Sequence, residues 1–273
     1  MKKINFTKMA GAGNDFLVVN PPKGLALKKL AQKACDRTNG IGADGLLILD
    51  PSKKSDYRMR IINADGTEAE MCGNGARCMA AYIAKYKKPK KELFSMETLA
   101  GEVLGKAAGE VAVVRLSNPQ DYTPNITLNV NDQDLTVYYI DTGVPHTIIY
   151  VDNLAKTNVE MMGRIIRYHD HFKPRGTNAN FVTKISDDLV DCRTYERGVE
   201  GETKACGTGS VAAGLVTYLL ANPNTLDKKN ARMKVQTKSG EILQITFDIT
   251  KGQIENVWLK GSARFIASGE YYL

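Results

Sequence analysis

The chain has 273 residues, 43% of them hydrophobic and 25% charged, which is ordinary for a globular enzyme and excludes a disordered or low-complexity protein. Its length allows one large domain or two of roughly 135 residues. The net charge of +7 is most evident in the run Lys85–Lys91. Because this run follows a predicted helix, contains Pro89 and has Tyr86 as its one aromatic residue, we interpret it as a solvated helix end and not as a nucleic-acid site.

The compartment is indicated by the first residues and by the cysteine count. Lys8, Asn14 and Asp15 precede any apolar run long enough for a signal peptide, and the longest apolar helix, near Val211–Ala221, is too short to span a bilayer. The five cysteines are an odd number at low density, which favours free thiols in a reducing compartment. We therefore expect a cytoplasmic protein without a membrane partner.

The first predicted elements are a strand at Phe16–Val19 and an amphipathic helix over Leu27–Cys35, where apolar residues recur at helical spacing and Cys35 fills the core. Further along, short apolar or alternating runs predict more strands. In chain order these are Leu46–Leu49, Tyr57–Ile62, Val111–Val114, Ile126–Val130, Ile148–Val151, Met233–Thr237 and Ile242–Ile249.

Two further helical segments, Ala76–Ala84 and Ser210–Ala221, are apolar almost all the way round, so we expect other elements to enclose each of them. A sheet curled around the helix would do so. The order of motifs in the first half also recurs in the second half at offsets of about 131 to 134 residues. We therefore predict an α+β fold with two similar lobes, each a curled, mostly antiparallel sheet around a central helix.

The boundary between the lobes is expected at the linker-like pair Asn118-Pro119. The first lobe then comprises residues 1–118 and the second residues 119–261. The last segment, residues 262–273, has the character of a strand, and we expect it to return to the first lobe.

Two cysteines share the same local sequence. Cys72 and Cys206 each begin a Cys-Gly-x-Gly turn at the start of an apolar helix. A thiol at a helix N-terminus lies near unsatisfied N–H groups and the positive end of the helix dipole, both of which favour the thiolate. A thiolate that removes a proton from carbon, opposed by a thiol that returns a proton to the other face, inverts a stereocentre. The pair therefore predicts one site built from both halves.

A carbon next to a carboxylate is a weak acid, so the negative charge that develops there must be met by preorganised donors in a water-poor pocket. Two helix N-termini aimed at one carboxylate make such an anion site. The backbone amides that would form it belong to Gly73, Asn74, Gly207 and Thr208.

Seven segments, in family order over nearly the whole chain, resemble diaminopimelate epimerases. They are Lys8–Phe16, Gly42–Gly45, Asn63–Gly66, Met71–Cys78, Asn178–Phe181, Tyr195–Gly198 and Ala205–Gly209. The resemblance implies an isomerase that uses no cofactor and no metal. It would interconvert LL- and meso-diaminopimelate on the route to lysine and peptidoglycan, with Cys72 and Cys206 as acid and base. It also implies the two-lobed fold and a homodimer.

The resemblance also implies roles for polar residues around the thiols. His146 and Glu196 would lie near the sulfur atoms and tune their ionisation. An Arg fork suits a carboxylate, while Asn carbonyls and a Glu suit an ammonium group, and the amino-acid substrate has both groups at each end. The residues that would hold it are Asn14, Asn63, Asn178, Glu196 and Arg197.

The chain departs from many family members at three places. Val144-Pro145-His146-Thr147 stands where many have Asn-Pro-His-Cys, and Gly45 stands where some have Gln, so two side chains that contact substrate are missing. The turn Glu196–Thr203 is one residue longer than the common form. These changes bear on contacts with the distal group of the substrate and leave the cysteine chemistry untouched.

Two other functions stay open. The same fold and thiols would suit a racemase for histidine or a proline-like amino acid, to which Val144 and Gly45 point. A non-catalytic amino-acid or nucleic-acid binding protein would need neither thiol. A metal site is disfavoured at Cys72 with Cys78, which lack zinc-site spacing, and at His169-Asp170-His171, whose setting is typical of solvated residues. A Cys72–Cys206 disulfide would be oxidative damage.

Overall fold

The computed structural model describes residues 3–20 and 24–273, which form many strands and four α-helices. These residues divide into two compact units. Unit 1 is the chain up to Arg115 together with Lys260–Leu273, and unit 2 is Leu116–Leu259. The chain therefore leaves unit 1 after Arg115 and re-enters it within strand β17 (Gln253–Ser262). No helix in the described part is both long enough and apolar enough to cross a bilayer.

The sheet of unit 1 is mostly antiparallel. Its strands pair in the order β18–β1–β2–β3–β4–β6–β7–β8, with β5 on the end of β4, and only the pairs β2–β3 and β4–β6 in this part of the structure are parallel. The strands are β1 (Lys3–Gly11), β2 (Asn14–Val19), β3 (Gly45–Asp50), β4 (Tyr57–Asn63), β5 (Glu68–Ala69), β6 (Phe94–Thr98), β7 (Gly101–Ala108), β8 (Val111–Arg115) and β18 (Arg264–Tyr272).

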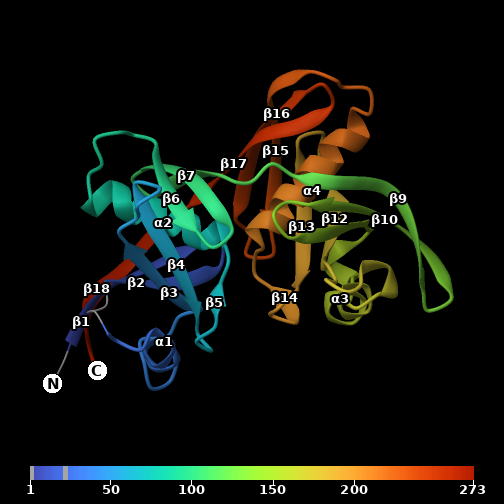
Figure 1. Cartoon of the computed structure of the whole chain (residues 1–273). Coiled ribbons are helices and arrows are strands. Elements are labelled where there is room, and N and C mark those ends of the chain that lie inside the picture. The colour runs from blue at the N-terminus through green and yellow to red at the C-terminus, as the bar shows by residue number, and fades with distance from the viewer. Residues whose placement is uncertain (1–2, 21–23) are drawn as a thin grey trace. The chain divides into compact units, whose positions relative to one another are not determined.

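Helix α2 (Gly73–Tyr86) is the central helix of unit 1, and Figure 1 shows it among the strands of that unit. It contacts β1 to β4, β7 and β8, and most of its residues are buried, as its apolar sequence predicts. Helix α1 (Leu27–Ala34) packs against β4 through one apolar stripe. Cys35, at the end of α1, is buried as predicted.

The sheet of unit 2 repeats this arrangement. Its strands pair in the order β9–β10–β11–β12–β13–β15–β16, with β14 on the end of β13, and the pairs β11–β12 and β13–β15 are parallel. The strands are β9 (Gln120–Val130), β10 (Gln133–Asp141), β11 (Pro145–Tyr150), β12 (Asn178–Lys184), β13 (Leu189–Glu196), β14 (Gly201–Thr203), β15 (Lys228–Thr237) and β16 (Ile242–Thr250).

Helix α4 (Gly207–Ala221) is the central helix of unit 2 and contacts β10 to β13, β15 and β16. Helix α3 (Val159–Arg167) packs against β12, β13 and β14. Single turns of 3-10 helix lie at Leu154–Lys156 and Asp170–Phe172. The predicted α+β fold of two similar units, each a sheet around a helix, is confirmed.

The strand register identifies equivalent positions in the two units. Gly45 on β3 lies opposite Asn63 on β4. In unit 2, Ala179 lies opposite Tyr195, so the next pair outward is Asn178 with Glu196. Asn178 therefore occupies the place of Gly45, and Glu196 the place of Asn63. The two units have the same frame and different side chains at these two positions.

Candidate active site

Cys72 caps the N-terminus of α2. Its φ is −146° and its ψ is 116°, and its Sγ accepts a hydrogen bond from the backbone N–H of Gly75 at 3.4 Å. A Cβ at Gly75 would lie 3.1 Å from Cδ2 of Leu47, so little room exists for a side chain there. The second glycine of the Cys-Gly-x-Gly turn therefore supplies the donor to the sulfur atom.

Cys206 caps α4 in the same way, from an extended backbone conformation. Its φ is −111° and its ψ is 115°, and its Sγ accepts from the N–H of Gly209 at 3.4 Å. Oγ1 of Thr208 lies 3.5 Å from the same sulfur. A Cβ at Gly209 would overlap Oδ1 of Asn180, so glycine is required. Both turns thus have the same chemical construction, as the sequence predicts.

The surroundings of Cys206 shift the pKa of its thiol in opposite directions. Burial raises the pKa of its thiol well above the usual value, and the negative charge of Glu196 raises it further. Hydrogen bonds from Thr208 and Gly209 lower the pKa without reversing that shift. The N–H of Gly209 at the helix N-terminus thus lowers the pKa of the Cys206 thiol, as the sequence predicts, but the cost of burying an anion is larger. The net effect of these surroundings favours the thiol form of Cys206.

In unit 1, the side chain of Asn14 is held from both ends. Its Nδ2 donates to Oδ2 of Asp44 at 2.9 Å, and its Oδ1 accepts from Nδ2 of Asn74 at 2.6 Å. Arg77, fully buried in α2, donates to Oδ1 of Asn74 at 2.9 Å. The structure thus links Asn14 to the first turn of the helix that Cys72 caps. Asn63 is exposed at the end of β4, and its Nδ2 donates to Oγ1 of Thr67 at 3.0 Å.

In unit 2, hydrogen bonds connect Asn178 to the neighbouring predicted residues. Its Nδ2 donates to the carbonyl of Pro145 at 2.8 Å, and its Oδ1 accepts from the backbone N–H of Arg197 at 2.8 Å. Oε1 of Glu196 accepts from Oγ1 of Thr203 at 2.5 Å. Unit 2 thereby brings Asn178, Glu196 and Arg197 together.

His146 lies within β11, although the sequence places it just before a strand. It is fully buried, and burial together with the positive charge of Arg197 lowers the pKa of its imidazole to about 3. His146 is therefore neutral at pH 7. Its Nδ1 lies 3.1 Å from Nδ2 of Asn180, and its Nε2 has no hydrogen-bond partner among the described residues.

Comparison with known proteins identifies the family. Residues 6–117 and 138–266 match the family model described as diaminopimelate epimerase. The diaminopimelate epimerase of Carboxydothermus hydrogenoformans is 39% identical over 288 residues, which cover 99% of this chain and 100% of the relative. That of Hydrogenobaculum sp. is 38% identical over 281 residues, which cover 96% of each chain. The chain belongs to the diaminopimelate epimerase family. It is therefore an isomerase, and the resemblance seen in the sequence is confirmed.

Solved structures with similar folds include proteins of other functions. A phenazine biosynthesis protein of the PhzF family from Bacillus anthracis has a TM-score of 0.75 at 18% identity, with 100% of both chains covered. A hydroxyproline epimerase from Agrobacterium vitis, with bound trans-4-hydroxy-L-proline, has a TM-score of 0.74 at 12% identity, with 98% of this chain and 92% of that chain covered. At these identities the likeness shows a shared fold.

Several polar residues of this family member were not singled out from the sequence, although their side chains contact predicted site residues. Asp44 holds Asn14, Thr203 holds Glu196, and Asn180 holds His146. Asp44 and Asn180 lie inside family-like segments and Thr203 ends the lengthened turn, and these were the only signals for them. The partner of Asn180 lies 34 residues away on the neighbouring strand, and that of Asp44, which precedes β3, lies 30 residues away on β2. The pattern of one sequence does not reveal such pairings.

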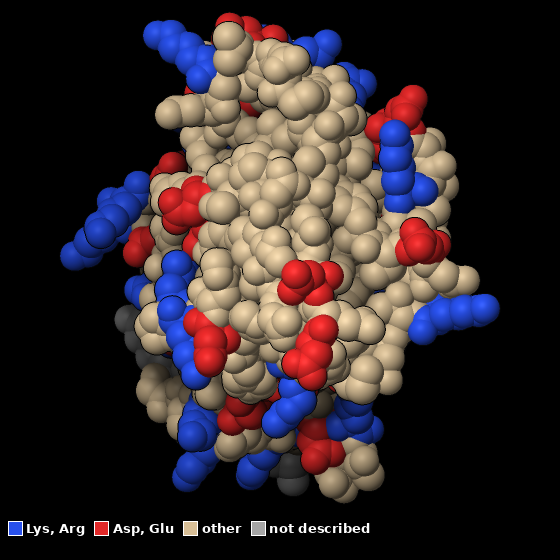
Figure 2. Space-filling model, turned by 90° about the vertical axis from the view of Figure 1, so that its right-hand side faces the viewer, with Lys and Arg blue, Asp and Glu red and all other residues tan. Residues whose placement is uncertain are grey.

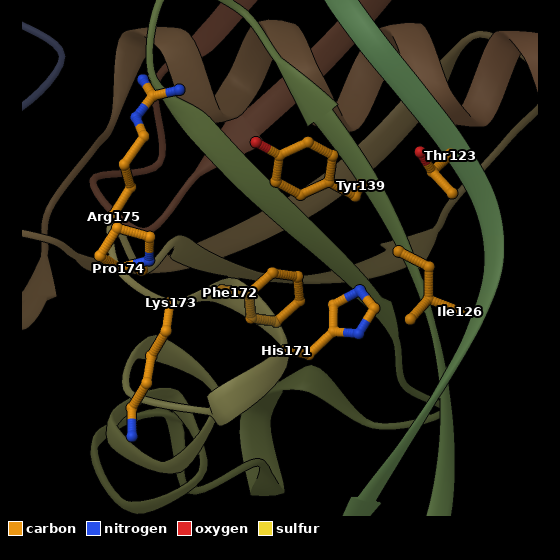
Figure 3. Close-up of a pocket in the computed structure, with 9 residues that line it drawn as sticks. Thr123, Ile126, Tyr139, His171, Phe172, Lys173, Pro174 and Arg175 are labelled. Carbon is orange, nitrogen blue, oxygen red and sulfur yellow. The ribbon is translucent and has the colours of Figure 1, made fainter.

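A surface pocket of about 320 Å³ in unit 2 contains none of the predicted site residues (Figure 3). Figure 3 shows the rings of Tyr139, Phe172 and His171 close together in it, and the first two are stacked with centroids 5.9 Å apart. Arg175 lines the pocket, and its carbonyl accepts from Nη1 of Arg197 at 3.2 Å. His171 lies here among aromatic rings, and the described residues include no cluster of three or more metal-ligating side chains.

Proposed function

We propose that the chain interconverts LL- and meso-diaminopimelate with Cys72 and Cys206 as the two acid/base groups. One sulfur removes the proton from the α-carbon, and the other returns a proton to the opposite face. The observation that carries this proposal is the matched N-capping of the two central helices by these two cysteines. The family membership supports the substrate.

The protonation state of Cys206 suggests the order of events in one direction. The Cys72 thiolate takes the α-proton, and the electron pair of the broken C–H bond remains on the substrate, delocalised into its carboxylate. The Cys206 thiol then gives its proton to the opposite face and becomes a thiolate. In the reverse direction the roles exchange. Because the surroundings of Cys206 raise its pKa, its thiolate is then a strong base.

The developing negative charge requires donors that are already in place. The backbone N–H groups of Gly73, Asn74, Gly207 and Thr208 lie in the first turns of α2 and α4, where helices leave such groups unpaired. We assign these amides to the carboxylate beside the reacting carbon. The guanidinium of Arg197 suits a carboxylate as well.

Contacts with the amino groups and the distal end of the substrate are assigned to Asn14, Asn63, Asn178 and Glu196. Hydrogen bonds from other residues hold the side chains of Asn14, Asn178 and Glu196 in one orientation. Fixed side chains of this kind position a substrate without further loss of rotamer freedom. His146 and Glu196 are assigned to tuning the thiols, Glu196 through its charge on Cys206.

The biological setting is part of the same proposal. The reaction would serve lysine and peptidoglycan precursor synthesis in the cytoplasm, and the chain has five cysteines, an odd number at low density, which suits a reducing compartment. The partner is a small amino acid, and the protein binds neither nucleic acid nor membrane and forms a homodimer. On the face drawn in Figure 2, acidic and basic side chains lie near one another around the rim and few lie at the centre, which supports the absence of a nucleic-acid surface there.

Proton exchange in deuterium oxide tests the proposal. Wild-type protein is expected to incorporate deuterium at the α-carbon of diaminopimelate as it converts LL to meso isomer, and Cys72→Ala and Cys206→Ala are expected to abolish that conversion. Cys35→Ala and Cys192→Ala are matched controls, because both thiols are buried and neither caps the N-terminus of α2 or α4. Turnover of histidine or hydroxyproline without turnover of diaminopimelate would identify an amino-acid racemase instead.

A further inference from the structure

Asn180 is a buried side chain of unit 2 with no role in the mechanism above. It lies in β12 and is fully buried. Its Oδ1 lies under the first turn of α4, where it would overlap a Cβ at Gly209. On its other side, Nδ2 is 3.1 Å from Nδ1 of His146. Asn180 therefore lies between this histidine and the helix start that Cys206 caps.

The neighbours of Asn180 fix the orientation of its carboxamide. Nδ2 lies 3.1 Å from the carbonyl oxygen of Thr147 and 3.3 Å from that of Asn178. Oδ1 accepts from Oγ1 of Thr194 at 3.0 Å. Exchanging the nitrogen and oxygen would turn an acceptor toward two carbonyl oxygens, which have no proton to donate. One orientation alone satisfies these groups.

This orientation determines where His146 carries its proton. The NH2 group of Asn180 has no lone pair to accept with, so a proton on Nδ1 of His146 would point at a donor and find no acceptor there. Nδ1 is therefore the unprotonated nitrogen. A neutral imidazole then has its single proton on Nε2. Nε2 is buried and has no partner among the described residues, so an N–H donor there has no acceptor in this part of the protein. A buried donor without an acceptor is costly, and a bound ligand would relieve that cost.

We propose that Asn180 is a positioning residue for the epimerisation: it fixes the ring of His146 and holds the imidazole proton on Nε2, so that the histidine presents a buried N–H to the substrate. Asn180 touches no reacting atom and acts through His146. The effect on rate rests on the proposed function. The tautomer is a property of the free protein and does not depend on that function.

Nitrogen NMR of the free protein tests the tautomer directly. The chain has three histidines, and His146 is identified as the one whose signals stay constant between pH 5 and 8 and disappear in His146→Gln. We expect its Nδ1 to have the shift of an unprotonated nitrogen and its Nε2 that of a protonated one. A protonated Nδ1 in the wild type would overturn the proposal. In Asn180→Asp, the carboxylate is an acceptor, and the proton is expected on Nδ1.

Kinetics test the effect on the reaction. Asn180→Leu keeps the branched shape and the number of heavy atoms and removes the donor, so we expect kcat to fall roughly 10- to 100-fold while KM changes less than about twofold. Thr217→Val is the matched control, because it removes a buried hydroxyl of α4 that bonds Tyr150 and the carbonyl of Ala213, away from His146. Equal kcat values for Asn180→Leu and Thr217→Val would contradict the proposal that Asn180 contributes to the rate through His146.

Failure of the proposed function and failure of the proposed role of Asn180 are distinguishable. If wild-type protein shows no exchange with diaminopimelate, the proposed function fails and the NMR result still decides the tautomer. If neither Asn180 variant folds, the wild-type spectrum still confirms or refutes a proton on Nε2.

Discussion

Cys72 and Cys206 both cap a helix from an extended backbone conformation and have different surroundings. In each case Sγ accepts a hydrogen bond at 3.4 Å from the backbone N–H three residues later. Cys206, however, is buried beside the carboxylate of Glu196, whereas Cys72 is half-buried. The Cys-Gly-x-Gly turn could be predicted from the sequence, because the capping thiol and the glycines act on backbone groups within a few residues of themselves. The ionisation of Cys206 could not, because it depends on Glu196 and on burial by residues far along the chain.

Thr208 is expected to keep Cys206 usable as a base. Its hydroxyl is one of the groups that lower the pKa of the Cys206 thiol, so Thr208→Val should raise that pKa and reduce the thiolate fraction. In a Cys72→Ala background, alkylation of Cys206 by iodoacetamide at pH 8 is expected to slow several-fold. Thr183→Val, which removes a hydroxyl bonded to the carbonyl of Val151, is the control. An unchanged alkylation rate would contradict the prediction.

His146 is expected to make stability depend on pH. Its pKa is about 3 in the folded protein and about 6.5 when unfolded, so between these values the unfolded chain binds a proton that the folded chain does not. This contribution to stability is fully present above pH 6.5 and falls with decreasing pH, by at most about 1.4 kcal/mol per pH unit. Urea unfolding at pH 4, 5 and 7 should give an unfolding free energy that changes less steeply with pH for His146→Gln than for wild type. His171→Gln, at an exposed position, should keep the wild-type dependence of unfolding free energy on pH.

At the scale of elements, α2 and α4 could be predicted because their sequences are apolar on nearly every side. A helix of this kind needs other elements, here a sheet, to cover all its faces. Helix α3 was not predicted, although Asn158 caps it and Val159 and Ile166 share its buried face. Its length of 9 residues and its β-branched residues weaken the helical signal. The sequence also did not reveal which strands pair, and strand pairing is what brings Asn180 to His146.

The first turn of α4 is expected to tolerate no side chain at residue 209. Gly209→Ala would force a Cβ against Asn180, which costs about 1–3 kcal/mol of unfolding free energy when the site cannot relax. Gly201→Ala is the control, because the nearest atom to its added Cβ is Oε1 of Glu160 at 3.8 Å. Urea unfolding of both variants measures the difference. Equal stability would show that the Asn180 side chain moves aside freely.

At the scale of the whole molecule, the sequence predicted two similar units from weakly repeated motifs, and the structure shows the same strand pairing in each. Within that frame, Gly45 and Asn63 of unit 1 correspond to Asn178 and Glu196 of unit 2. The framework is duplicated and the side chains have diverged. Because framework positions need only a suitable apolar pattern, they are more predictable than the polar contacts that distinguish the units.

Unit 1 is expected to depend on its last strand. β18 pairs with β1 from Lys3 opposite Tyr272 to Ala10 opposite Arg264, so deleting residues 264–273 leaves β1 with an open edge. We expect hydrogen exchange to accelerate at the amides of β1 and the shortened protein to unfold at lower urea concentration. Deleting Leu273 alone, which lies outside β18, should change neither. Unchanged protection of β1 in the longer deletion would contradict the prediction.

The discontinuity of unit 1 also sets an order for folding on the ribosome. Leu116–Leu259 is one uninterrupted stretch, so unit 2 has all its residues as soon as that stretch has emerged. Unit 1 is translated first, but β1 waits for a neighbour more than 250 residues away. The half of the protein that begins synthesis is therefore the half that finishes folding last, and until then β1 is open to pairing with other nascent chains.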